Sequence, residues 1–125
     1  MISLSSDSDI LRMTTDAAVD KLGVYASWVD YPLTGDNVYG ATVSQVSSVG
    51  TFDILETSGS NEVERQLLSC FITNTSGDPC GIILKEFDGA TEARIADFTL
   101  NGSETLVWTV NQGFFVHTST GIKLG

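Results

Sequence analysis

Basic residues are scarce in this sequence. Six Lys and Arg residues stand against sixteen Asp and Glu residues, which gives a formal net charge of −10. Nucleic-acid binding depends on clustered Lys and Arg side chains that displace counterions from the phosphate backbone, and here the basic residues are scattered along the chain. The composition therefore argues against direct nucleic-acid binding, and it predicts an acidic surface that favours solubility.

Long apolar segments are missing as well. The chain has no run of roughly 18 apolar residues, the length that a membrane-spanning helix needs. Its first ten residues, MISLSSDSDI, have neither a basic region nor an apolar run typical of a signal peptide. We therefore expect synthesis in a cytoplasm and no contact with a membrane. On that basis the glycosylation-like sequences at residues 74–76 and 101–103 are expected to be turns.

Residues that carry common chemistry are few. His117 is the single histidine, and the chain lacks a nucleophile elbow, a Cys-x-x-Cys pair, a His-x-x-x-His pair and a phosphate-binding glycine loop. The pairs Glu62/Glu64 and Glu86/Asp88 have the i, i+2 spacing that places two carboxylates on one face of a strand, as in a glycosidase cleft. Both pairs adjoin turns and are expected to be solvated strand ends, so we predict no catalytic residue and no enzyme activity.

Metal ligands and cofactor motifs are likewise not predicted. The segments 7–9 (Asp-Ser-Asp) and 36–37 (Asp-Asn) offer oxygen ligands, but neither has the Asp-x-Asp-x-Asp-Gly spacing of a calcium loop. We expect no bound metal ion and no cofactor.

What the sequence does contain is a series of short β-favouring segments separated by turns. Its 125 residues suit one domain, which buries roughly 65–70% of the unfolded surface without needing disulfides or metal. We find no repeat, no linker and no helical pattern of ten residues. The predicted fold class is all-β: a single-domain antiparallel β-sandwich, jelly-roll-like, with eight or nine short strands. Outside the middle of the chain, strands are expected at residues 10–14, 24–30, 38–49, 52–57, 94–100, 106–110, 114–117 and near 122.

The stretch from Gln66 to Phe87 is predicted to form the central hairpin. Its apolar segments 67–72 and 82–84 flank a turn-forming cluster of Asn, Ser, Gly, Asp and Pro. In such a hairpin Cys70 and Cys80 would be offset by three residues, or roughly 10 Å along the ladder, beyond the roughly 7 Å that a disulfide spans between Cα atoms. We therefore predict two thiols that fill the core.

Residues 1–9 are predicted to be a flexible N-terminal arm preceding a β-sandwich domain of residues 10–125. The segment is rich in Ser and Asp and has little to bury. A neighbouring subunit could order this arm through Ile2 and Leu4, and simple fraying is the alternative.

A second candidate contact lies in the loop that contains Tyr31, Pro32 and Leu33. Apolar side chains on an otherwise polar connection can mark an interaction surface.

Five aromatic residues could stack on sugars if they shared an exposed face: Trp28, Trp108, Tyr25, Tyr31 and Tyr39. Each tryptophan falls in an alternating apolar row, which favours burial of both in the core of the sandwich.

Four segments, taken together, resemble a family of small virion structural proteins of tailed bacteriophages. They are residues 24–30 (VYASWVD), 68–74 (LSCFITN), 98–106 (FTLNGSETL) and 113–116 (GFFV), within a span of about residues 14–123. The resemblance implies a β-sandwich that acts by assembly and has no catalytic residues to transfer. The pronounced acidity and the two cysteines depart from what we expect of that family.

The function expected from this resemblance is capsid decoration. Copies would bind the outer capsid lattice, with the major capsid protein or other virion proteins as partners, and would form a homo-oligomer such as a trimer. The acidity fits an outer surface of the virion, because a surface facing packaged DNA would meet charge of the same sign. Alternatives are a neck, tail or fibre-attachment component, or, in a different class, a carbohydrate-binding module for the host surface.

Overall fold

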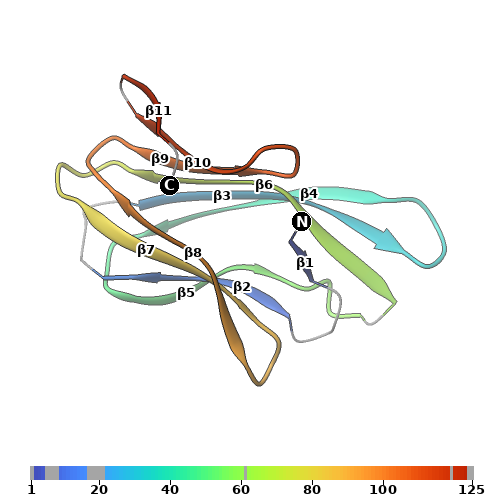
Figure 1. Ribbon diagram of the computed structural model, residues 1–125. Coiled ribbons are helices and arrows are strands. Elements are labelled where there is room, and N and C mark those ends of the chain that lie inside the picture. Colours follow the sequence, from blue (N-terminus) through green and yellow to red (C-terminus); the bar gives the residue numbers. More distant parts are fainter. Residues whose placement is uncertain (1, 5–8, 17–21, 61, 119, 124–125) are drawn as a thin grey trace.

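The strands of the chain form two antiparallel sheets that face each other across one hydrophobic core (Figure 1). The computed structural model describes residues 2–4, 9–16, 22–60, 62–118 and 120–123. The larger sheet has the order β11 (Gly121–Lys123), β10 (Gly113–Thr118), β9 (Thr105–Thr109), β6 (Val63–Asn74), β3 (Leu22–Pro32) and β4 (Val38–Val46), with β1 (Ser3–Leu4) paired to β6. The smaller sheet has the order β5 (Gly50–Glu56), β2 (Ile10–Thr15), β7 (Cys80–Phe87) and β8 (Glu92–Leu100).

This architecture confirms the predicted all-β sandwich. The core consists of alternate side chains from the two sheets, for example Leu22, Val24 and Ala26 of β3 against Leu11 and Met13 of β2. The described residues contain eleven strands rather than eight or nine. The strand near residue 122 is β11, whereas β1 has only two residues, too few to show an alternating pattern in the sequence. Among the described residues, no helix has the length and apolar character to cross a membrane.

The hairpin predicted for Gln66 to Phe87 does not form, because its two strands belong to different sheets. β6 ends at Asn74 in the larger sheet and β7 begins at Cys80 in the smaller sheet, so the residues between them carry the chain from one layer to the other. The segment 101–104 makes the reverse crossing, from β8 to β9. Turn-forming residues serve a tight hairpin and a crossing between layers equally well, so their presence did not decide between the two.

The buried side chain of Asn74 stabilises the connection from β6 to β7. Its Nδ2 donates hydrogen bonds to the carbonyl oxygens of Asp78 at 2.7 Å and Leu100 at 3.0 Å. Its Oδ1 accepts hydrogen bonds from the backbone N–H of Ser76 at 3.0 Å and from the Ser76 hydroxyl at 2.9 Å. One fully buried amide thus satisfies polar groups of the turn after β6 and of the end of β8.

The backbone of Asn74 binds the connection from β8 to β9. Its N–H donates to the carbonyl oxygen of Glu104 at 2.9 Å, and its own carbonyl accepts from the N–H of Ser103 at 2.8 Å. Ser103 has a positive φ of 68°, whereas the neighbouring Gly102 does not have a positive φ. A Cβ on Gly102 would lie 2.7 Å from the carbonyl oxygen of Ser76, so the two crossing turns touch where only glycine fits.

The prediction of a flexible arm at residues 1–9 is wrong for residues 2–4, which pack against the sandwich. Ser3 and Leu4 pair with Gln66 and Arg65 of β6, alongside the part of β6 that β9 does not cover. Leu4 is fully buried, and Ile2 is 8% exposed. Two apolar side chains at a spacing of two residues fit one face of a strand, so this segment completes the core. Residues 1 and 5–8 lie outside the described residues.

Both cysteines are buried thiols, as predicted, but the hairpin geometry used to predict them does not exist. Cys70 pairs in register with Ala26 and Trp108 in the larger sheet, whereas Cys80 pairs with Leu100 in the smaller sheet. Burial raises the pKa of Cys70 to about 12, so this thiol resists ionisation and fills space in the core.

We expect Asn74→Ala to lower the free energy of unfolding by about 2–4 kcal/mol, because it leaves buried carbonyl and N–H groups without partners. Asn37→Ala, the same change on an exposed loop, should alter it by less than about 0.5 kcal/mol. Urea unfolding followed by circular dichroism measures both values. Equal midpoints for the two variants would contradict the structural role of Asn74.

Candidate functional site

The five predicted interaction residues do not form one surface. Tyr31 and Pro32 end β3, and Leu33 begins the turn toward β4, where it is 79% exposed. Its backbone N–H donates to the carbonyl oxygen of Glu62 at 3.1 Å, which fixes the start of this turn. Ile2 and Leu4 instead face the core. Any contact made by Tyr31, Pro32 and Leu33 stays a prediction.

The β3–β4 hairpin is the main apolar projection of the described residues. It carries six of the nine exposed large apolar side chains: Tyr25, Tyr31, Leu33, Val38, Tyr39 and Val43, the other three being Val49, Val110 and Ile122. β4 is also an edge strand of its sheet, so its outer backbone groups are not used by another strand. Exposed apolar side chains along an unpaired edge are typical of a contact surface.

The outer face of the larger sheet carries no formally charged side chain over most of its area. The core residues of β3, β6, β9 and β10 point inward, so the alternate residues point outward. We call the following set the neutral face: Tyr39, Ala41, Val43 and Gln45 of β4; Gly23, Tyr25, Ser27 and Val29 of β3; Gln66, Ser69, Phe71 and Thr73 of β6; Thr105, Val107 and Thr109 of β9; and Gly113, Phe115 and His117 of β10.

An apolar row crosses the centre of the neutral face. Strand register places Val43, Tyr25, Phe71, Val107 and Phe115 side by side on five successive strands. The rings of Tyr25 and Phe71 stack, with centroids 5.7 Å apart and planes inclined by 21°. Val107 is 8% exposed although it lies outside the core cluster, so the row buries part of its own apolar surface.

Hydroxyl pairs flank this row on both sides. The hydroxyls of Ser27 and Ser69 lie 2.6 Å apart, and those of Thr73 and Thr105 lie 2.9 Å apart. Each pair joins neighbouring strands on the outer face and adds a cross-strand contact that helps to fix the register.

Ion pairs, in contrast, concentrate on the outer face of the smaller sheet. Arg12 lies between two core residues of β2, so it points outward, and its guanidinium is 4.0 Å from the ring centre of Phe87. Arg12 pairs with Asp53 of β5 at 2.9 Å and with Glu92 of β8 at 3.4 Å. Lys85 of β7 pairs with Glu92 at 3.8 Å, and Arg94 pairs with Asp97 within β8 at 3.1 Å. The two outer faces of the sandwich therefore differ sharply in charge.

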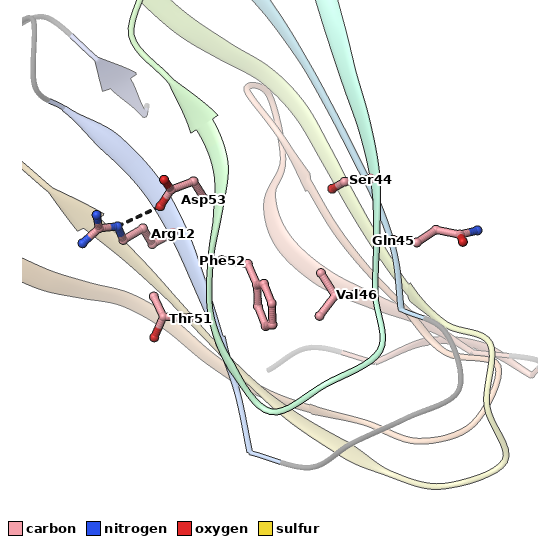
Figure 2. A pocket seen from close by; sticks show the side chains of 7 residues that line it. All are labelled: Arg12, Ser44, Gln45, Val46, Thr51, Phe52 and Asp53. Atoms are coloured by element: carbon pink, nitrogen blue, oxygen red, sulfur yellow. Dashed lines mark hydrogen bonds and ion pairs between the residues drawn. The ribbon is translucent and has the colours of Figure 1, made fainter.

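A groove of about 640 Å³ opens between the edge strands β4 and β5 (Figure 2). Phe52 of β5 points toward Val46 of β4 inside it, while Arg12 and Asp53 lie on the opposite side of β5. A second hollow of about 340 Å³ shares Ser44 and Asp53 with this groove. Along this edge the two sheets are not bridged by a strand, so the groove is the open side of the sandwich.

Arg65 is one of the residues that line the second hollow. It forms a two-pronged ion pair with Asp30 at 2.7 and 2.9 Å, and its Nη1 donates to the carbonyl oxygen of Glu56 at 3.1 Å. The guanidinium lies 3.8 Å from the ring centre of Trp28. The indole of Trp28 also lies against Gly40, where it occupies the place that a Cβ would take. Because these contacts engage all three guanidinium nitrogens, Arg65 is positioned to support the fold rather than to bind a ligand.

The predicted aromatic positions are divided between the core and the surface. Trp108 is 5% exposed in the core, and Trp28 is partly buried and packs against it. Tyr25, Tyr31 and Tyr39 are all exposed on the outer side of the β3–β4 hairpin. The burial expected for the tryptophans is thus confirmed for Trp108, whereas Trp28 is covered only in part.

The polar residues considered for chemistry are spread over the surface. His117 is exposed on β10, and Glu62 and Glu64 lie near the start of β6, far in sequence from Glu86 and Asp88. No group of three His, Cys, Asp or Glu side chains that could hold a metal ion occurs within the described part of the chain, to which Asp7 does not belong.

Glu86 and Asp88 share a shallow hollow of about 310 Å³ with Asp9. Burial, and then the negative charges of Asp9 and Asp88, raise the pKa of Glu86. The pKa of Asp88 is lowered, because its carboxylate accepts hydrogen bonds from the backbone N–H groups of Thr91 and Ala90. The two neighbouring carboxyl groups therefore titrate in opposite directions from their ordinary values.

Sequence reasoning missed the neutral face. The sequence did contain a signal for it. The outward positions of the strands predicted at 24–30 and 106–110 are uncharged, whereas those of the strand at 94–100 include a charged residue, Asp97. That signal has no spatial meaning until the pairing order is known, because only pairing brings Phe115, Phe71 and Val43 into one row.

Comparison with known proteins gives no significant match: no family model fits the sequence, and no curated protein or solved structure is detectably similar to the chain.

We expect carboxyl NMR titration to place the midpoint of Glu86 above, and that of Asp88 below, the ordinary range of each residue type. The raised pKa of Glu86 means that its contribution to stability is present at low pH and lost as the pH rises through its folded-state value. The lowered pKa of Asp88 gives a contribution that is lost as the pH falls through its folded-state value.

The variant Asp88→Asn tests the assigned causes. It should lower the pKa of Glu86 but leave it raised, because burial is the largest cause. Asp97→Asn, further along β8, is the control and should leave the pKa of Glu86 unchanged. An unshifted Glu86 in the wild-type protein would contradict the assignment.

Proposed function

We propose that this chain is a virion structural protein that decorates the outer capsid of a tailed bacteriophage. The observation that carries the proposal is the concentration of exposed apolar side chains on the β3–β4 hairpin, an edge of the sandwich that can meet another protein. The resemblance of residues 24–30 to small virion proteins falls on the first strand of this same hairpin. The proposal assigns the chain no reaction and no cofactor.

The partner in this proposal is the major capsid protein or another virion protein. The hairpin tip at Tyr31, Pro32 and Leu33 would make the contact, because Leu33 projects almost fully into solvent. The net charge of −10 supports an outward position, since packaged DNA would repel an acidic protein on the inner surface. A neck, tail or fibre-attachment role would use the same hairpin and differ only in the number of copies.

A carbohydrate-binding role is the second candidate, because Tyr25, Tyr31 and Tyr39 are exposed on one side of the hairpin. The stacking of Tyr25 on Phe71 counts against it, since a sugar needs the free face of an aromatic ring. The tryptophans would not report such binding, because Trp108 is buried and Arg65 covers Trp28. Glycan titration followed by chemical shifts of the tyrosine rings therefore distinguishes this role from decoration.

Co-sedimentation with capsids that lack this protein tests the decoration role. The wild-type chain should bind at a stoichiometry that follows the capsid lattice, and Leu33→Asp should reduce binding at least tenfold by placing a charge in the contact. Val49→Asp is the control, because Val49 is another exposed apolar residue but lies in the turn between β4 and β5. Binding limited to a single ring of copies would exclude lattice decoration and favour a neck or fibre position.

A further inference from the structure

The neutral face lacks a partner in the isolated chain. Sandwich proteins normally place polar and charged residues on their outer sheet faces, as this chain does on its smaller sheet. The larger sheet instead presents the row Val43, Tyr25, Phe71, Val107 and Phe115, between rows of hydroxyl and amide side chains. A face of this composition is typical of a contact with another protein surface.

The charge distribution indicates what kind of protein fits. Each copy of the chain carries a net charge of −10, so two copies repel unless their contact excludes the acidic groups. The neutral face is the broad surface on which this condition is met, because the ion-paired acidic side chains Asp53, Glu92 and Asp97 lie on the opposite sheet. A basic partner would gain more from those acidic surfaces than from an uncharged one.

The size of the neutral face is sufficient for a specific contact. On the neutral face β4 and β3 span seven residues each, β6 spans eight, and β9 and β10 span five each. At about 3.3 Å per residue and about 4.8 Å per strand, the footprint is roughly 510 Å². Two such faces bury about 1,000 Å², which reaches the roughly 1,000 Å² expected of a biological interface.

Projections and a hollow occur on the same face, as self-association requires. Val43 is 78% exposed and Tyr39 is 68% exposed, so both stand above the sheet. Beside Val43, a hollow of about 200 Å³ is lined by Gly23, Tyr25 and Phe71, and no atom lies within 4 Å of the place that a Cβ on Gly23 would take. In a two-fold arrangement each copy offers the other both a projection and a hollow.

We propose that the neutral face is a two-fold interface between two copies of this chain, packed sheet against sheet. The contact places the apolar rows of the copies together and leaves the acidic sheet of each copy at the outside. This inference goes beyond decoration and does not rest on it, because two copies can pair whether or not a capsid binds them.

Sedimentation velocity of the full chain over a range of concentrations tests the interface. The wild-type protein should sediment as a dimer, and Val43→Glu and Tyr39→Glu should each weaken dimerisation at least tenfold, because each places like charges opposite one another. Val49→Glu adds the same charge to an exposed valine outside the neutral face and should leave the dimer intact. Circular dichroism should show the same folded spectrum for all three variants.

A monomeric wild-type protein, or an oligomer unaffected by Val43→Glu and Tyr39→Glu, would overturn the proposal. So would a monomer whose Tyr25 signals shift on adding soluble oligosaccharides, since the neutral face would then bind sugar. A wild-type chain that does not bind capsids, or capsid binding unaffected by Leu33→Asp, would overturn decoration, whereas an intact dimer would leave this interface standing, so failure of the two proposals can be told apart.

Discussion

The buried amide of Asn74 joins two of the connections between the sheets and fixes how the sheets are placed at that end of the sandwich. The chain passes between the layers after β6 and returns after β8, and Asn74 binds backbone groups of both passages. A crossing removes backbone groups from the sheet ladders, so they need other partners when they are buried. Gly102 allows the turns to touch, and Asn74 satisfies the polar groups that this close approach encloses. The large sheet is thereby held above the small one at one end of the sandwich.

The opposite character of the two outer faces follows from this layered arrangement. Each sheet uses one face for the core and leaves the other available for solvent or a partner. The smaller sheet covers its outer face with ion pairs centred on Arg12 and Glu92, whereas the larger sheet has an apolar row flanked by hydroxyl pairs. The proposed copy–copy interface uses the uncharged face, and the proposed capsid contact uses the hairpin tip at Leu33. The two contacts are therefore compatible within one assembly.

Much of the fold was predictable from the sequence because strand alternation is a local property. The pattern at residues 24–30 correctly predicts β3, and the patterns at 94–100 and 106–110 correctly predict β8 and β9. The errors arose where the outcome depends on distant residues. Gln66 to Phe87 has the composition of a hairpin, yet β6 finds better partners in β3 and β9. Ile2 and Leu4 looked isolated in a polar segment, and only the uncovered stretch of β6 explains their burial.

The sequence by itself determined the all-β class, the positions of most strands, the acidic charge and the burial of Trp108, because each follows from residue type and a period of two. Only the tertiary structure decided which strands share a sheet, and pairing brings together side chains that lie up to about ninety positions apart, such as Tyr25 and Phe115 in one row. The neutral face, the open groove between β4 and β5 and the role of Asn74 all result from that pairing. Their physical reason is the same: hydrogen-bonded ladders and core packing select one register from many that local patterns allow.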